Sequence, residues 1–458
     1  MRVLMFGWEF PPHISGGLGT ACYGMTRGLA YCGVEVIFVV PKSYGDEDQT
    51  SVKLVGASQV PIKRRTYAFT EERQFGVEAI KTSHALEMTY IEVGSKLLPY
   101  LSPEEFQKYS HEHLQKNELS LHEFDNGTTR GSSVLTEVVG TMEFTGKYGP
   151  DLMQEVSNYA LVSSEIAHEQ TFDIIHAHDW LTYPAGIAAK RMSGKPLVVH
   201  VHATEFDRSG ENYNTVVYDI EKSGMEQADL VITVSNLTRN IVINRYGINP
   251  DKVVTVYNAV EPGTESGAEV FVKAVDEKVV TFLGRITYQK GPEYFMEAAN
   301  KVLKHSNNVR FVMAGSGDLL RKMIRYAARL GITEKFHFTD FLKGRDVDNM
   351  FAVSDVYVMP SVSEPFGISP LEAMRSNVPV IISKQSGVSE ILKHAIKVDF
   401  WDVDAMADAI YGLITYESLP LMFQHYGRDE VNNLRWENAA LLIKNQYTNL
   451  LSSRNNPL

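Results

Sequence analysis

The chain has 458 residues, a length that corresponds to two or three domains. Hydrophobic residues make up 44% of it and charged residues 22%, a globular composition that excludes disorder over most of the length. The 44 lysine and arginine residues are outnumbered by 56 aspartate and glutamate residues. The resulting formal net charge of −12 argues against general binding to nucleic acid or to an anionic membrane.

Cysteine content and apolar runs exclude further classes of protein. The two cysteines, Cys22 and Cys32, are too few for a disulfide scaffold or a cysteine zinc site. No apolar run reaches the roughly 18–20 residues that a membrane span needs. The run Met1–Glu9 is too short for a signal peptide and is interpreted as a buried first strand. We therefore expect a cytoplasmic protein without a membrane span.

Short apolar runs alternate with amphipathic segments along most of the chain. The first series of expected strands is Val3–Phe6, Val34–Val40, Ile174–Ala177, Leu197–His202, Leu230–Val234 and Val253–Tyr257. The second series is Val279–Leu283, Val309–Ala314, Phe336–Thr339, Val356–Met359 and Val378–Ser383. The expected helices include Leu18–Tyr31, Leu181–Arg191, Asn236–Tyr246, Glu293–His305 and Leu319–Leu330. Because the strands are continuously apolar, they are typical of parallel sheets covered on both faces, and the alternation predicts doubly wound α/β domains.

The two series of strands predict two domains of similar kind. Between them, Glu261–Glu277 contains proline, glycine and serine and predicts a linker. We expect an N-terminal domain over residues 1–262, with an irregular insertion at about 44–150, and a C-terminal domain over residues 268–430. The last segment, 431–458, predicts a helix that packs back across the boundary. Ligands of open α/β sheets bind at the carboxyl ends of the strands, so functional residues are expected just after strands.

A glycine-rich string, Gly16-Gly17-Leu18-Gly19, follows the first strand and precedes a helix. Glycines there let backbone N–H groups approach an anion, and the helix N-terminus adds a positive dipole. A tight turn that needs positive φ is an equally good interpretation. The spacing is not GxGxxG, so a dinucleotide cofactor is not expected.

A second string, Gly284–Gly291, places Arg285 and Lys290 in one loop after the strand Val279–Leu283. Two cations at a strand end can bind a diphosphate and neutralise charge on a leaving phosphate. Two ordinary surface charges are the alternative for this pair.

A third string, Ser363–Glu372, follows the strand Val356–Met359. Ser369 and Glu372 have the spacing of a capping box with proline between them, which gives Glu372 a structural role. Glu364 has no such role and is expected to accept hydrogen bonds from sugar hydroxyls. N–H groups near Gly367 and Ile368 can hold phosphate oxygens.

Two histidine pairs, His176/His178 and His200/His202, end two of the expected strands. Alternating residues of a strand share a face, so each pair can act together. Four histidines, or three with Asp179, are a chemically sensible metal site; hydrogen bonding to a sugar is the other interpretation. Two Asp-x-Asp strings, Asp346–Asp348 and Asp402–Asp404, are better explained as acidic first turns of helices.

Taken together, the motifs resemble those of the retaining glycosyltransferases with the GT-B fold, especially the glycogen and starch synthase branch. The stretch from Glu364 to Glu372 is similar to the family's E-x7-E signature, and Arg285 with Lys290 is similar to its donor-phosphate pair. The string from Gly16 to Gly19 and the string His176–Trp180 resemble the glycogen synthase branch. The resemblance covers most of residues 1–45 and 170–430.

This resemblance implies two Rossmann-like domains facing across a cleft, and it implies roles for single residues. Arg285 and Lys290 would bind the donor diphosphate, Glu364 the transferred sugar and Glu372 the ribose. Asp179 and His202 would line the side of the acceptor and reacting sugar, with His178 a lesser candidate there. Backbone contacts to the donor are expected from a further set: Gly16, Gly17, Gly315, Gly367 and Ile368.

We therefore expect a retaining hexosyltransferase that moves a hexose, with glucose the first candidate, from ADP-glucose or UDP-glucose to a glucan or other sugar. No metal or other cofactor is expected. The alternatives are a metal-dependent hydrolase built on the paired histidines, a non-catalytic sugar sensor, and a glycosyltransferase of the same fold with a non-glucan acceptor. The nucleotide base, the acceptor, the linkage and the oligomeric state are left open.

Overall fold

The computed structural model describes residues 1–14, 16–72, 83–93, 96–99, 131–261, 273, 275–342 and 344–455. The chain forms two compact units that do not coincide with the two halves of the sequence. Unit 1 comprises Met1–His13 and Val36–Leu197, and unit 2 comprises Ile14–Glu35 and Val198–Leu458. The expected boundary near residue 262 falls within unit 2, and residues 262–272 of the expected linker lie outside the described residues. The division into domains 1–262 and 268–430 therefore stays a prediction.

Unit 1 is built on parallel strands in the order β8-β1-β2-β3. Their bounds are Arg2–Phe6 (β1), Glu35–Val40 (β2), Lys53–Gly56 (β3) and Ile174–His178 (β8). β1 pairs with β8 and β2 with β3, both in parallel. Nearly every residue of β1, β2 and β8 is buried, as their continuous apolar runs predict. Two helices belong to the same unit, α3 (Leu152–Glu169) and α4 (Tyr183–Ser193).

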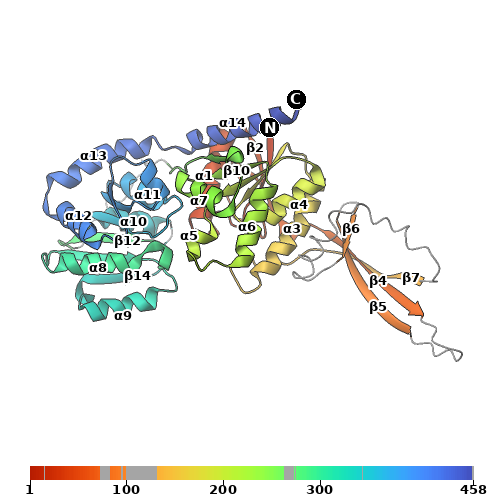
Figure 1. The fold of residues 1–458 in the computed structure, drawn as a ribbon, viewed down its shortest axis with the longest axis horizontal. Coiled ribbons are helices and arrows are strands. Elements are labelled where there is room, and N and C mark those ends of the chain that lie inside the picture. The colour runs from red at the N-terminus through yellow and green to blue at the C-terminus, as the bar shows by residue number, and fades with distance from the viewer. Residues whose placement is uncertain are drawn as a thin grey trace. The chain divides into compact units, whose positions relative to one another are not determined.

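Between β3 and α3 the chain forms a separate antiparallel sheet in the order β6-β5-β4-β7. Its strands are Ile62–Glu72 (β4), Ser83–Val93 (β5), Lys96–Pro99 (β6) and Gly131–Gly140 (β7), drawn in orange in Figure 1. These strands fall in the span where the sequence predicts only an irregular insertion.

The first part of unit 2 contains parallel strands in the order β11-β10-β9. The strands are Leu197–Val201 (β9), Leu230–Thr233 (β10) and Val253–Thr255 (β11). The helices that accompany them are Gly17–Tyr31 (α1), Glu205–Ser209 (α5), Thr215–Gln227 (α6) and Asn236–Tyr246 (α7).

The second part of unit 2 is a six-stranded parallel sheet in the order β14-β13-β12-β15-β16-β17. The strands are Lys278–Leu283 (β12), Val309–Ala314 (β13), Phe336–Thr339 (β14), Val356–Met359 (β15), Val380–Ser383 (β16) and Ile396–Val398 (β17). The helices are Pro292–Leu303 (α8), Leu320–Leu330 (α9), Arg345–Val353 (α10), Ser369–Arg375 (α11), Val403–Thr415 (α12) and Ser418–Asn432 (α13).

Helices cover both faces of this six-stranded sheet. One core is shared by α8, α9 and α12, with Phe295, Met323 and Ile410 fully buried in it. A second core is shared by α10, α11 and α13, with Phe351 and Leu371 in it. In Figure 1, α8 and α9 are labelled below β12, and α10 and α11 are labelled above it. This is the doubly wound α/β arrangement that the sequence predicts.

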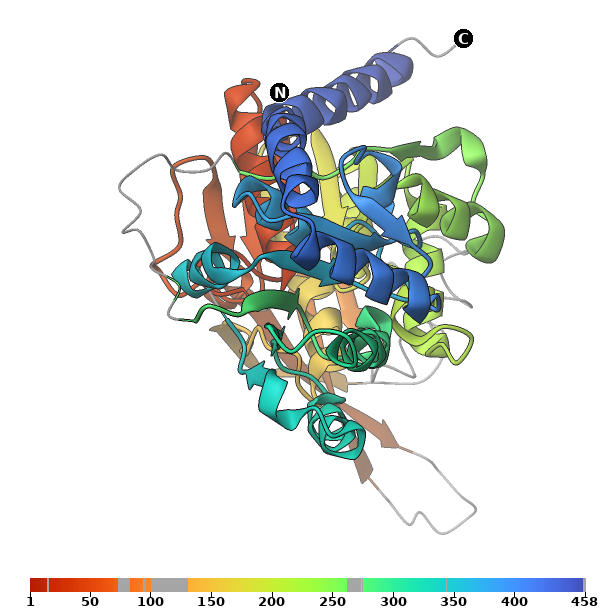
Figure 2. The same ribbon diagram turned by 90° about the vertical axis from the view of Figure 1, so that its left-hand side faces the viewer.

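The last helix, α14 (Trp436–Asn455), lies against α1 near the start of the chain. Figure 2 shows the two helices side by side, α14 in dark blue and α1 in red. The Lys444 ammonium donates to the Cys32 carbonyl at 2.7 Å. Helix α14 thus brings the C-terminal segment back to residues 17–32. In the part of the chain that the structure describes, no helix combines the length and apolarity needed to cross a bilayer.

Candidate active site

The loops after β12 and β15 bring Lys290 and Glu364 together. Lys290 ends a short 3-10 helix, η3 (Tyr288–Lys290), and its Nζ lies 2.5 Å from Glu364 Oε2. Glu364 is 7% exposed, and the buried Ser361 hydroxyl donates to the same carboxylate oxygen at 3.1 Å. A buried carboxylate needs such partners, because an unpaired buried charge is costly. The pair confirms that the two sequence motifs meet at the carboxyl edge of one sheet.

Arg285 lies in the same loop as Lys290 and has a different environment. Its side chain is exposed, and it has no hydrogen-bond or ion-pair partner among the described residues. Five N–H donors of a guanidinium are therefore available to an anion at the end of β12. The site thus combines a lysine that forms an ion pair, Lys290, with an exposed arginine, Arg285, that has no ion-pair partner among the described residues.

The turn that presents Lys290 depends on Gly291. This residue has φ 64° and begins α8, whose first residue is Pro292. A Cβ built on Gly291 would lie 2.1 Å from the Pro360 carbonyl oxygen, so only glycine fits there. The Val362 N–H donates to the Gln289 carbonyl at 2.9 Å, which links the two loops through their backbones.

Backbone bonds also hold the Glu364 loop on its other side. The Glu364 N–H donates to the Gln385 carbonyl at 3.0 Å, and the Gly387 N–H donates to the Glu364 carbonyl at 2.9 Å. Glu364 therefore has a fixed main chain as well as a fixed carboxylate. The N–H groups of Gly367 and Ile368, next along the loop, have no acceptor within the described part of the chain.

The capping box that the sequence predicts at Ser369 and Glu372 is not formed. Helix α11 has Ile368 as its N-cap and includes Ser369 as its first residue, with no side-chain cap bond. The prediction is wrong because Ser369 has already entered the helix. Glu372 is half-buried, and burial raises the pKa of its carboxyl group, a shift that Arg375 opposes. Its expected contact with ribose stays a prediction.

Sequence reasoning missed Ser363 and Asp207. The Ser363 hydroxyl donates to Asp207 Oδ1 at 2.6 Å, which joins the Glu364 loop to α5. Asp207 also forms a true capping box with Thr204 at the start of α5. Burial raises the pKa of Asp207, and the hydrogen bonds from Ser363 and Thr204 oppose that shift. The Thr204-x-x-Asp207 spacing was the sequence signal for the box, but nothing in it points to Ser363.

His202 follows β9 and lies two residues before Thr204. Its ring stacks on that of His200, with ring centroids 4.3 Å apart. Burial lowers the pKa of His202 to about 3, so the imidazole is neutral at physiological pH and can donate one hydrogen bond and accept another.

The remaining catalytic candidate, Asp179, and the acceptor-side candidate, His178, belong to unit 1. His178 is fully buried at the end of β8, and its ring stacks on His176 at 4.4 Å. Asp179 follows with φ 58°, a conformation that few residues other than glycine adopt. The Thr182 N–H donates to the Asp179 carbonyl at 3.0 Å and closes the turn. The strained backbone at a strand end is typical of functional positions.

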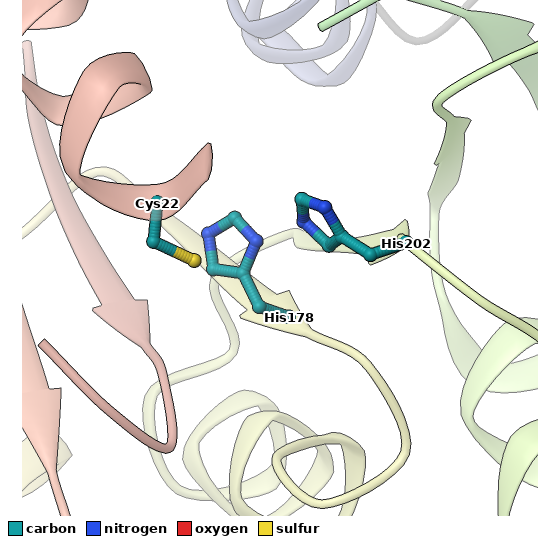
Figure 3. A group of neighbouring side chains, drawn as sticks. All are labelled: Cys22, His178 and His202. Carbon is teal, nitrogen blue, oxygen red and sulfur yellow. The ribbon is translucent and has the colours of Figure 1, made fainter. Parts of the chain in front are cut away.

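Gly16 and Gly17 begin α1. Gly16 is the N-cap with extended backbone (φ −175°), and a Cβ on either glycine would meet nothing within 4 Å. The interpretation as a turn that needs positive φ is therefore wrong, and the open space is compatible with the expected approach of a ligand. Cys22 follows on the same helix. Figure 3 shows where its side chain and those of His178 and His202 arise, from α1, the end of β8 and the residue after β9.

Gly315 follows β13 with φ 137°, and a Cβ there would lie 2.0 Å from the Gly284 carbonyl oxygen. The loops after β12 and β13 thus touch through their backbones. The predicted role of Gly315 in donor binding stays a prediction.

Potential metal ligands also occur within unit 1. His13, Asp46 and Glu47 have ligand atoms within 4.8 Å of one another. His13 Nε2 already lies 2.6 Å from Asp46 Oδ1, and the Glu47 carboxylate accepts from the Tyr44 and Gly45 N–H groups. These partners give the three residues a structural role. The hydrolase alternative needs histidines from both units and stays a prediction, as does the expectation that no metal is required.

The two Asp-x-Asp strings begin α10 and α12, as expected.

Comparison with known proteins identifies the family. Residues 265–430 match the family Glycosyl transferases group 1, and residues 142–263 match Glycosyltransferase Family 4. The chain is 33% identical over 294 residues to an uncharacterised glycosyltransferase of Methanocaldococcus jannaschii, covering 60% of this chain and 75% of that protein. This chain belongs to the group 1 glycosyltransferases. The resemblance expected from the Arg285, Lys290 and Glu364 motifs is confirmed.

Solved structures confirm the fold of this glycosyltransferase. Sucrose-phosphate synthase from Thermosynechococcus elongatus is similar with a TM-score of 0.65 and 16% identity, and 99% of each chain is covered. The catalytic domain of starch synthase IV from Arabidopsis thaliana, bound to ADP and acarbose, is similar with a TM-score of 0.62 and 16% identity, covering 98% and 99% of the two chains. At such identities the likeness concerns the fold, and it bears out the GT-B fold with two parallel-sheet α/β domains.

Proposed function

We propose that this glycosyltransferase moves a hexose, with glucose the first candidate, from ADP-glucose or UDP-glucose to a glucan or another sugar, with retention of configuration. The observation that carries the proposal is the pairing of Lys290 with Glu364, in which the lysine comes from the loop that also carries the exposed guanidinium of Arg285. A starch synthase with the same fold is known bound to ADP and acarbose, which supports this class of donor and acceptor. The proposed reaction requires no metal.

The chemistry follows from charge development. When the bond between the anomeric carbon and the diphosphate breaks, positive charge grows on the sugar and negative charge on the leaving phosphate. Arg285 and Lys290 would stabilise the phosphate, which is the task that a metal performs in other enzymes. Glu364 would accept hydrogen bonds from hydroxyls of the transferred sugar. In this mechanism the leaving phosphate takes the proton of the acceptor hydroxyl on the same face of the sugar, so no carboxylate is needed as nucleophile.

The test is release of nucleoside diphosphate from a panel of sugar nucleotides, with glycogen, maltooligosaccharides and simple sugars as acceptors. We expect Arg285→Ala, Lys290→Ala and Glu364→Ala each to lower turnover by about 100-fold or more, the range for losing one charge-stabilising group. Lys301→Ala is the matched control, because Lys301 lies on the exposed side of α8 in an ion pair with Asp404. Turnover with a chelator present should be unchanged. Near-normal turnover in all three site variants would refute the assignment.

A further inference from the structure

Four aromatic residues lie at the same sheet edge as the candidate active site. Tyr288 and Tyr294 follow β12, and Phe400 and Trp401 follow β17. Because all strands of this sheet are parallel, the residues that follow them lie at one edge, the edge where such sheets bind ligands. We call these four residues the aromatic platform.

Two rings of the platform are exposed to solvent. Trp401 is 58% exposed and Tyr288 is 60% exposed. Tryptophan is highly buried on average, so an exposed indole at the sheet edge that carries the candidate active site is a candidate binding surface. The Trp401 indole N–H and the Tyr288 hydroxyl have no hydrogen-bond partner among the described residues. Each ring therefore presents an apolar face and an available polar edge.

Three rings of the platform pack against one another. Phe400 packs edge-on against Trp401, with ring centroids 4.8 Å apart, and against Tyr294 at 5.1 Å. The Trp401 carbonyl accepts from the Val403 N–H at 3.0 Å at the start of α12. A ligand that stacks on Trp401 would therefore meet a surface that is already ordered and would not have to pay for ordering it.

Two charged groups beside the platform are paired with each other. Lys384 Nζ lies 2.9 Å from Asp399 Oδ2, and the Gln385 amide donates to Asp399 Oδ1 at 2.9 Å. This pairing lowers the pKa of Asp399, so the carboxylate stays ionised and matched by the lysine. This pair offers hydrogen-bonding groups without a net charge, and the exposed carboxylate of Asp402, next to Trp401, would repel a phosphorylated ligand. The rim of the platform therefore fits a neutral ligand better than a phosphorylated one.

The platform is connected to the active-site loop on the side of the transferred sugar. Gln385, which holds Asp399, accepts the Glu364 N–H through its carbonyl. In the strand order, β17 lies beyond β15 and β16, whereas β13 with Gly315 lies on the opposite side of β12. A ligand stacked on Trp401 would therefore lie on the same side of β12 as Glu364. The nucleotide is expected on the other side of β12, near Gly315.

We propose that the aromatic platform binds a chain of neutral sugar residues, of the α-glucan class, beside the active site. A pyranose ring has an apolar face for Trp401 and Tyr288 and hydroxyls for their polar edges and the Gln385 rim, a combination suited to amphipathic aromatic side chains. This inference rests on the proposed function for its ligand class. It adds a binding site that would hold a long acceptor near Glu364.

The test measures binding of maltoheptaose in the absence of donor, by calorimetry and by retardation in gels that contain glycogen. Trp401→Ala is expected to weaken maltoheptaose binding by about tenfold, and Trp401→Phe should retain part of the affinity. Tyr416→Ala is the matched control, because Tyr416 is 62% exposed at the other end of α12. The control and both Trp401 variants should bind UDP and ADP like the wild type.

The outcomes separate this inference from the proposed function. If no acceptor elicits nucleoside diphosphate release but Trp401→Ala still loses maltoheptaose binding, the platform is supported and the proposed reaction fails. Equal maltoheptaose binding by the wild type and Trp401→Ala overturns the inference. So does a loss confined to UDP or ADP, which would assign the platform to the nucleotide base. Failure of the wild type to bind maltoheptaose, glycogen and dextran overturns it as well.

Discussion

Ser363 shows how one hydroxyl can act on the active site through its neighbour. Glu364 is fixed from its own sheet by Lys290, Ser361 and the Gln385 carbonyl, whereas Ser363 is fixed from α5 by Asp207. Asp207 is 2% exposed and also accepts from the Thr204 N–H and hydroxyl, at 2.8 and 2.7 Å. The hydroxyl of Ser363 thus acts as a positioning group for Glu364 and is not itself a catalytic group.

Replacing Ser363 with alanine should impair catalysis while leaving the fold intact. The variant removes one hydrogen bond to a charged acceptor, which corresponds to roughly a three- to tenfold loss in kcat/KM. Asp207 keeps its two bonds from Thr204, so the thermal midpoint should change little. Ser363→Thr, which retains the hydroxyl, should recover part of the activity. A Ser363→Ala enzyme with wild-type kinetics would show that Asp207 contributes only to the stability of α5.

His202 gives a prediction about pH. Its pKa is lowered to about 3 from 6.5, so between these values the unfolded chain binds a proton there that the folded chain does not bind. Stability rises with pH wherever the unfolded state holds more protons. This residue therefore lowers the free energy of unfolding as the pH falls from about 7.5 to 5. His202→Gln should show a smaller drop in thermal midpoint between pH 7.5 and pH 5.

The control for this measurement is His168→Gln, an exposed histidine on α3. It should keep the wild-type difference between the two pH values. If His202→Gln also keeps the wild-type difference in thermal midpoint, the His202 imidazole is protonated in the folded protein at pH 5. The conclusion that it is a neutral hydrogen-bonding group would then be wrong.

At the scale of elements, the turn from η3 into α8 sets the position of Lys290. Gly291 combines φ 64° with a close approach to the Pro360 carbonyl, so the loops after β12 and β15 pack backbone to backbone there. Gly331, which ends α9, has nearly the same conformation (φ 72°), but a Cβ on it would meet nothing within 4 Å. A comparison of alanine variants at the two glycines therefore separates the cost of a positive φ from the cost of a steric clash.

Gly291→Ala should therefore destabilise the protein more than Gly331→Ala. Strain alone costs about 1 kcal/mol in either variant, and the clash with Pro360 adds about 1–3 kcal/mol at position 291. Because Lys290 precedes Gly291, the first variant should also lose activity, whereas Gly331→Ala should not. Thermal unfolding and turnover of the two variants, measured together, provide the check. Equal stability losses would mean that the loop shifts to accept the methyl group.

The same elements show what the sequence could and could not predict. Strands such as Val309–Ala314 were predicted with their observed bounds, because a buried parallel strand is a continuous apolar run. Arg285, Lys290 and Glu364 were predicted to meet because residues after parallel strands lie at one edge. β17 was missed because three residues make too short a run, and the partner of Ser363 was missed because Asp207 lies 156 residues away. Ser369 was misassigned because a capping-box spacing does not fix the residue at which a helix begins.

For the whole molecule, contact between α1 and α14 joins the two ends of the sequence. Gly24 and Gly28 are buried, one turn apart on α1, so they share a face of that helix. A Cβ on Gly24 would lie 2.2 Å from Trp436 Nε1, and one on Gly28 would lie 2.6 Å from the Trp436 carbonyl oxygen. The absence of side chains at these positions lets α14 approach closely and places Lys444 over the Cys32 carbonyl.

Gly28→Val should therefore displace α14 from α1. The added atoms would meet the Trp436 backbone, which cannot move without moving the helix, and such overpacking costs about 1–3 kcal/mol. Once the bond from Lys444 to Cys32 is lost, trypsin should cleave after Lys444 severalfold faster than in the wild type, as measured by mass spectrometry. Tyr31→Val is the control, because it introduces the same β-branched residue into α1 at a position that is 81% exposed. If both variants are cleaved at the wild-type rate, the close packing of α14 on Gly28 is not what holds the C-terminal segment in place.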